Sequence, residues 1–167
     1  MMSVSLGAEE AGSRLATWDG RLSIAAVNSP GSVTVSGDVA ALDALAAQLA
    51  EDGVRARRVP GVDTAAHSVH VEVLRDRMLA DLSAVRPGSS PVPFVSTVTG
   101  TELDTRELDT HYWYRNVREP VLFEQATRTL LCPASSSAEP CGAAPPRRQG
   151  SSTATFSIQA GVPLAHT

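Results

Sequence analysis

The chain passes from a strand-like run to the start of a helix within residues 57–70, RRVPGVDTAAHSVH. Val and Arg precede Pro60, small and turn-forming residues follow it, and His67 stands where an amphipathic helix is predicted to begin. Because imidazole titrates closest to neutrality among side chains, a histidine held at such a chain reversal is a candidate proton shuttle. A histidine that starts a helix without any chemistry is the alternative interpretation.

Composition limits the class of protein. With 167 residues the chain has room for one domain, or for a small domain and part of another. Hydrophobic residues make up 43% and aromatic residues 4%, so the predicted core depends on Val, Leu and Ala. A net charge of −4 without a strong basic cluster argues against a nucleic-acid partner. Without a long apolar run or a secretory pattern, no membrane partner is expected, and we expect a soluble, cytoplasmic protein.

Hydrophobic periodicity and turn residues predict alternating strands and helices on both sides of this stretch. The expected strands cover residues 22–28, 33–36, 54–59 and 94–99, and the expected helices cover residues 38–53, 71–85 and 103–131, the last divided at Pro120. Asp38 is the predicted N-cap of the first helix, and Gly53 ends it. This order predicts an α+β fold of the ferredoxin-like kind, with helices on one face of a sheet.

Four separate segments resemble the acyltransferase domains of modular (type I) polyketide synthases. They are AAVNSPGSVTVSGD at 25–38, GVRARRVP at 53–60, PFVSTVTG at 93–100 and YWYRNVREPV at 112–121. The resemblance covers roughly residues 1–131, in order and without large gaps, and bacterial malonyl-CoA:acyl-carrier-protein transacylases are wider relatives.

The resemblance implies a division of the chain. Residues 1–21 are expected to be a lead-in from a larger α/β-hydrolase-like subdomain, and residues 22–100 to form the ferredoxin-like small subdomain. Residues 101–131 are expected to return to the larger subdomain as helices. Residues 132–167 lack apolar periodicity and fit nothing in the family, so we expect this tail to be disordered or aberrant, as from a cut or frame-shifted end.

The resemblance also implies a ping-pong acyl transfer from acyl-CoA to an acyl carrier protein within a polyketide synthase module. A serine made nucleophilic by a histidine attacks the thioester, and the phosphopantetheine thiol of the carrier protein then takes the acyl group. His67 matches the family base. The segment around Asn116 matches the one whose main-chain carbonyl orients the imidazole. No bound cofactor is implied.

Two features depart from the family pattern. No Gly-x-Ser-x-Gly occurs in the sequence, and the arginine that pairs with the substrate carboxylate in the family has no counterpart here. We therefore expect a fragment of an acyltransferase.

The selectivity motif also differs. Tyr-Ala-Ser-His accompanies methylmalonyl units and His-Ala-Phe-His malonyl units, whereas Thr64, Ala65 and Ala66 precede His67 here. The lost volume makes room for a larger α-substituent, although substrate choice stays weakly determined because a methylene is worth only about 1–3 kcal/mol.

Other residues allow two interpretations. Asn28 is a candidate for lining the substrate cleft, as in relatives, but a turn explains it equally well. His70 follows His67 by one helical turn without a carboxylate or Cys at ligand spacing, so no metal site is expected. Arg55, Arg57 and Arg58 are suited to an acidic carrier protein or form a solvated strand face. The alternative function is a non-catalytic ferredoxin-like module that binds a partner through its sheet or its Arg-rich strand.

Overall fold

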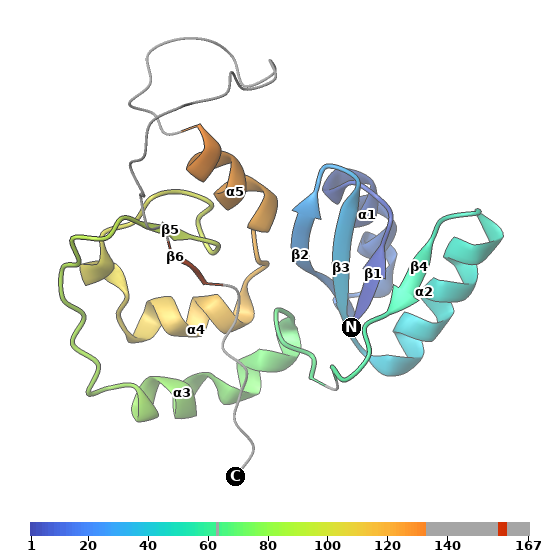
Figure 1. The fold of residues 1–167 in the computed structure, drawn as a ribbon. Coiled ribbons are helices and arrows are strands. Elements are labelled where there is room, and N and C mark those ends of the chain that lie inside the picture. Colours follow the sequence, from blue (N-terminus) through green and yellow to red (C-terminus); the bar gives the residue numbers. More distant parts are fainter. Residues whose placement is uncertain (63, 133–156, 160–167) are drawn as a thin grey trace.

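The computed structural model describes residues 1–62, 64–132 and 157–159, which form two parts that lie side by side (Figure 1). The first part is a four-stranded sheet with helices, and the second is mainly helical. In the first part the elements are β1 (Met2–Val4), α1 (Ala8–Leu15), the 3-10 turn η1 (Ala16–Trp18), β2 (Leu22–Ser29), β3 (Ser32–Gly37), α2 (Val39–Glu51) and β4 (Ala56–Arg58). In the second they are the 3-10 helix η2 (Val69–Leu74), α3 (Arg75–Asp81), β5 (Phe94–Ser96), η3 (Thr105–Glu107), α4 (Thr110–Arg118), α5 (Phe123–Leu131) and β6 (Ser157–Gln159).

The sheet has the strand order β2-β3-β1-β4, and every neighbouring pair is antiparallel. Combined with the element order strand, helix, strand, strand, helix, strand, this is the ferredoxin-like arrangement. The predicted fold class is confirmed.

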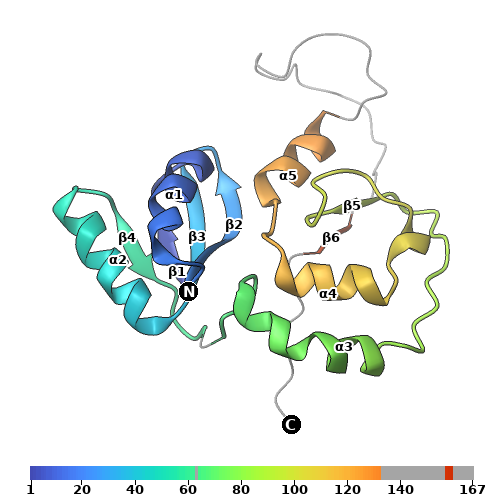
Figure 2. The same ribbon diagram turned by 180° about the vertical axis from the view of Figure 1, so that it is seen from behind.

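The hydrophobic core lies between the sheet and the two helices. Side chains alternate across a strand, so Met2 and Val4 of β1 face the same side as Val33 and Val35 of β3, and all four are buried. Leu42, Leu45 and Leu49 of α2 pack against them at helical spacing. Figure 2 shows α1 in front of the strands on this covered side. The Asp38 side chain accepts the Ala41 N–H at 2.9 Å, which makes it the N-cap that the sequence predicts.

The ferredoxin-like unit begins and ends earlier in the chain than expected. Residues 1–21 were expected to be a lead-in, but they supply β1, a central strand, and α1. A three-residue strand is too short to show alternation in the sequence. The segment expected as the fourth strand, 94–99, lies outside this sheet, because β5 pairs in parallel with β6 instead. The unit therefore occupies residues 2–58 and not 22–100.

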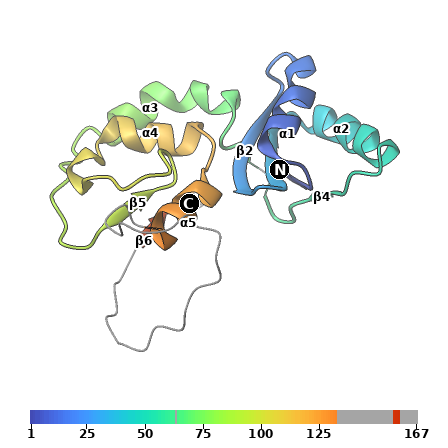
Figure 3. The same ribbon diagram turned by 90° about the horizontal axis from the view of Figure 1, so that it is seen from above.

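The second part packs around aromatic residues. Phe94 and Tyr112 meet edge to face with ring centroids 6.5 Å apart, and Trp113 meets Tyr112 in the same way at 5.3 Å. Helices α3 and α4 lie side by side (Figure 3). The single helix expected over 71–85 is instead η2 followed by the short α3, and Val71 is the buried residue of these two elements.

Most of the tail expected to be disordered lies outside the described residues. Residues 157–159 are the exception, since they form β6, which pairs with β5.

A short segment after α4 joins the two parts. Val121 lies alongside β2 in a parallel bridge with Ala26. Its N–H donates to Ala25 O and its carbonyl accepts the N–H of Val27, both at 2.9 Å. The Leu122 N–H donates to Thr97 O at 2.7 Å, so the same segment is also attached to the turn after β5. Within the described residues, no helix is long and apolar enough to cross a membrane.

Candidate active site

His67 occupies a strained turn between the two parts of the chain. Its φ of 58° lies in the left-handed region, where Asp19 is the other non-glycine residue of the described chain. Such a conformation costs on the order of 1–3 kcal/mol and is common at functional sites. The His67 N–H donates to Val117 O at 2.8 Å, which fixes the turn on the end of α4. The buried Ser68 hydroxyl donates to Ala65 O and accepts the His70 N–H, so the turn is also closed from within.

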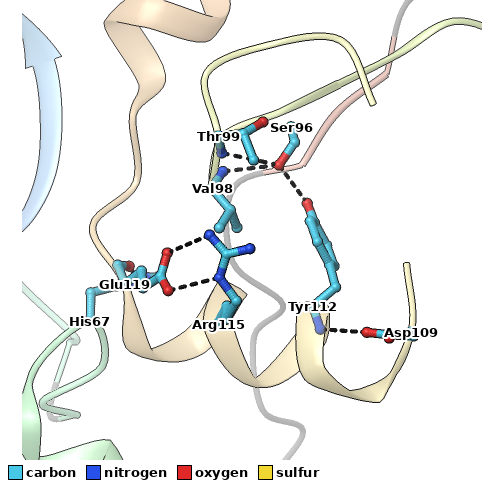
Figure 4. A network of polar contacts seen from close by, with 8 residues as sticks. All are labelled: His67, Ser96, Val98, Thr99, Asp109, Tyr112, Arg115 and Glu119. Carbon is cyan, nitrogen blue, oxygen red and sulfur yellow. Dashed lines mark hydrogen bonds and ion pairs between the residues drawn. The ribbon is translucent and has the colours of Figure 1, made fainter. Parts of the chain in front are cut away.

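The imidazole of His67 is oriented by a main-chain carbonyl. Its Nδ1 lies 2.8 Å from Glu119 O, and Figure 4 shows the two residues next to each other. A carbonyl oxygen only accepts hydrogen bonds, so Nδ1 must carry the proton. Nε2 is then an unprotonated acceptor, and the described residues provide no partner for it. This tautomer is the one that a general base needs.

The orienting carbonyl belongs to Glu119 and not to the Asn116 position that the sequence indicated. Glu119 is the C-cap of α4 with φ −85° and ψ 160°, an extended conformation. Pro120 follows it, and the residue before a proline is restricted to extended conformations. The Glu119 carbonyl therefore leaves the helix axis and reaches His67. Asn116 lies one turn earlier, 2% exposed, and its Oδ1 has no hydrogen-bond partner.

Two ion pairs hold the end of α4. The Arg115 Nε and Nη2 atoms lie 2.8 and 3.1 Å from the two carboxylate oxygens of Glu119, as Figure 4 shows. Arg118 donates to Glu72 Oε1 through Nε and Nη2 at 3.0 and 2.7 Å, which connects α4 to η2 just after His67. Both pairs are partly exposed, so each adds little stability by itself, but both act where the imidazole is attached.

A buried hydroxyl pair supports the same region from the other side. Ser96 Oγ and Tyr112 Oη lie 2.8 Å apart, and Ser96 Oγ also accepts the N–H groups of Val98 and Thr99 (Figure 4). The pair fixes the turn after β5 against α4, and that turn holds the Leu122 N–H. Sequence reasoning missed Glu119, Ser96 and Tyr112 as supporting residues. Pro120 after Glu119 was the one signal that pointed to the carbonyl.

The remaining sequence candidates lie around the turn or apart from it. Thr64 is exposed and Ala65 and Ala66 are half-buried on the connection that leads into His67. Asn28 is exposed on β2, where its Nδ2 donates to Thr34 Oγ1 at 3.0 Å. Among the described residues, the side-chain hydrogen bond of Asn28 is to Thr34 and not to this connection. His70 is exposed, and among the residues that the structure describes no three metal-ligating side chains are grouped.

Burial lowers the pKa of His67 below its usual value, and the hydrogen bond from Nδ1 to the Glu119 carbonyl raises it by less. The unfolded histidine titrates near 6.5. Between that pH and the lower pKa of the folded state, the unfolded chain therefore binds more protons than the folded chain. The His67 contribution to stability is thus complete above about pH 6.5 and is lost as the pH falls toward the folded pKa. Urea unfolding measured between pH 7.5 and 5 should therefore show that the free energy of unfolding decreases as the pH falls.

The matched control for this titration is His67→Asn. Asn tolerates the left-handed conformation and does not titrate, so the pH slope should be flatter in the variant. An unchanged slope would show that another group is responsible.

A sequence profile of the acyl transferase domain matches residues 1–138. Polyketide synthase GfsB of Streptomyces halstedii is 57% identical over 132 residues, which are 78% of this chain and 2% of GfsB. The spectinabilin polyketide synthase system protein NorC of Streptomyces orinoci is 50% identical over 131 residues, 78% of this chain and 6% of NorC. The chain thus spans a small part of these relatives.

Solved structures show the same likeness. The acyltransferase domain from module 8 of the salinomycin polyketide synthase has a TM-score of 0.76 and 48% identity, over 78% of this chain and 30% of that chain. A loading acyltransferase from the avermectin modular polyketide synthase has a TM-score of 0.74 and 44% identity, over 78% of this chain and 42% of the other.

Proposed function

The chain belongs to the acyl transferase family, and from this membership we propose that it supplies the general base of an acyltransferase domain in a modular polyketide synthase. The observation that carries the proposal is the fixed tautomer of His67. With Nδ1 on the Glu119 carbonyl, Nε2 is left to accept a proton.

In the proposed reaction the nucleophilic serine comes from a part of the domain outside these residues. His67 Nε2 takes the hydroxyl proton as the serine oxygen bonds to the thioester carbon of acyl-CoA. The tetrahedral intermediate collapses, the carbon–sulfur bond breaks, and the imidazolium returns the proton to the CoA thiolate.

The second half of the reaction reverses these roles. His67 deprotonates the phosphopantetheine thiol of an acyl carrier protein, and the thiolate attacks the acyl-serine ester. The serine oxygen leaves and receives the proton from the imidazolium.

We also propose that the acyl pocket accepts α-substituted malonyl units. Thr64 and Ala66 stand where methylmalonyl-associated relatives carry Tyr and Ser, and both are smaller. The connection that carries them leads directly to His67, so their volume bears on the space beside the imidazole. Discrimination between neighbouring sizes should be modest, about 10–200-fold per methylene.

A chimera tests the proposed activity. Residues 1–131 replace the matching part of the module 8 acyltransferase domain of the salinomycin polyketide synthase, which supplies the rest of the domain. Incubation with methylmalonyl-CoA should give one acyl adduct by intact-protein mass spectrometry. The 167-residue chain alone should give none, because it has no Gly-x-Ser-x-Gly.

Two results would contradict the proposal. A stoichiometric adduct on the isolated chain would place a nucleophile within it. A chimera that folds but forms no adduct with any acyl-CoA would favour the non-catalytic binding module instead.

A further inference from the structure

Two arginines of the ferredoxin-like unit differ from the other described arginines. Within residues 1–62, 64–132 and 157–159, Arg55 and Arg57 make no ion pair or side-chain hydrogen bond, and both are exposed. The neighbouring Arg58 is engaged by Asp43 and Val39 O. The other described arginines are also engaged, most of them by carboxylates, Arg75 by the ring of Tyr114 and Arg86 by backbone carbonyls.

Both free guanidinium groups lie on one face of the sheet. Ser3 pairs with Arg57 in the β1–β4 register, and the Ser5 N–H donates to Arg55 O at 2.9 Å. Met2 and Val4 face the helices, so the alternating Ser3 and Ser5 face the other side, together with their cross-strand partners. Two serines and two arginines thus form a compact array on the face that α1 and α2 leave uncovered.

The same four residues line a hollow of about 420 Å³. Arg58, Val59 and Pro60 complete its wall. Val59 and Pro60 also begin the connection that ends at His67. The hollow and the candidate base therefore lie at the two ends of one short segment.

The chemistry of this hollow fits phosphate. Arginine donates in a fork that matches two phosphate oxygens, and serine hydroxyls commonly add a further donor. Residues two apart on a strand are about 7 Å apart, which allows the two arginines to contact neighbouring phosphates. The volume of the hollow lies within the usual range for small-molecule sites, about 300–1,000 Å³. An acidic protein surface would instead require a contact of about 800 Å² on each partner.

We propose that Arg55 and Arg57, with the hydroxyls of Ser3 and Ser5, bind the phosphates of coenzyme A. The inference rests on the proposed acyl transfer, which requires an acyl-CoA at His67. The phosphates at one end of the pantetheine arm bind in the hollow, and the thioester at the other end is left for the base. The phosphate that links a pantetheine arm to a carrier protein has the same chemistry, so the test separates these sources.

The experiment is a ¹H–¹⁵N NMR titration of the full 167-residue chain. The ligands are CoA, 4′-phosphopantetheine, pantetheine and inorganic phosphate, at concentrations up to several millimolar. CoA should shift the amide signals of β1 and β4, 4′-phosphopantetheine should do so more weakly, and pantetheine, which has no phosphate, should not. The double variant Arg55→Gln/Arg57→Gln should weaken CoA binding by at least about tenfold, since it removes both charged donors to the phosphates.

The matched control is Arg14→Gln/Arg77→Gln, which removes the same charge elsewhere, from the ion pairs of Arg14 with Glu10 and Asp52 and of Arg77 with Asp81. It should bind CoA with the affinity of the unchanged chain. Both double variants should keep the dispersed spectrum of the folded chain, because all four side chains lie outside the core.

Several results would overturn the site. They are the absence of shifts with CoA, equal shifts with pantetheine, and unchanged affinity in the Arg55→Gln/Arg57→Gln variant. Shifts of the same amides by inorganic phosphate at the same concentration as CoA would show an adventitious ion only. Shifts by an apo carrier protein, which lacks the arm, without shifts by CoA would show a protein contact surface instead. These readouts are independent of the acyl adduct in the chimera, so each proposal can fail without the other.

Discussion

Replacing His67 by alanine in the chimera should lower the rate of acyl-enzyme formation by about a thousandfold or more. A serine hydroxyl is a weak nucleophile unless a base within hydrogen-bond reach takes its proton. Nε2 of His67 is the group that the Glu119 carbonyl prepares for this step. Members of such a pair act as a unit, so removing one removes most of their joint contribution. Single-turnover mass spectrometry with methylmalonyl-CoA measures the rate directly.

Two further variants make this result specific. His70→Ala removes an exposed imidazole one helical turn away and should leave the rate within about twofold of the unchanged chimera. His67→Asn suits the left-handed conformation but offers no base, so it should be as slow as His67→Ala. If His70→Ala were slow and His67→Ala were not, the base would have been assigned to the wrong histidine.

Replacing Gly37 by alanine should cause a large loss of stability, roughly 3 kcal/mol or more, from combined strain and overpacking. Gly37 has φ 146°, and a Cβ there would lie 2.1 Å from the carbonyl oxygen of Arg21. That oxygen accepts the Asp38 N–H at 3.0 Å, so it cannot move without losing a hydrogen bond at the start of α2. Urea unfolding of the 167-residue chain, followed by circular dichroism, measures the difference.

Two other glycines provide the controls. Gly53 also has a positive φ, 70°, but a Cβ there would meet nothing within 4 Å, so Gly53→Ala should cost only about 1 kcal/mol. Gly12 lies inside α1 with equally free surroundings, and Gly12→Ala should stabilise the chain by about 0.5–1 kcal/mol. Equal losses at Gly37 and Gly53 would contradict the steric explanation.

The elements with strong local signals could be predicted, and those set by distant contacts could not. The helix after Asp38 shows an N-cap, a leucine stripe and a terminal glycine, and α2 follows this pattern closely. β1 shows none of these signals, because three residues carry no period and its central place in the sheet depends on β3 and β4. The strand at Phe94 was predicted as an element, but its partner is β6, far along the chain.

In the candidate site, too, some residues could be predicted from the sequence and others could not. His67 was recognised because imidazole chemistry belongs to one side-chain type. The carbonyl that orients it could not be recognised with equal certainty, since every residue has a carbonyl and Asn116 and Glu119 are neighbours on one helix end. The choice depends on where α4 stops, and the restriction that Pro120 imposes on Glu119 decides it. The Ser96–Tyr112 pair depends on the packing of β5 against α4, which no local pattern encodes.

The parallel bridge at Val121 has a consequence for inheritance. The base and the carbonyl that fixes its tautomer are 52 positions apart in sequence, and the segment that carries this carbonyl is bonded to β2, an even earlier part of the chain. A genetic crossover between codons 67 and 119 would combine the histidine turn of one ancestor with the helix end of another, and that helix end places the carbonyl. Crossovers outside residues 25–122 would transmit the imidazole, its carbonyl and their attachment to the sheet together. Recombination between synthase genes should therefore leave its surviving junctions outside this interval.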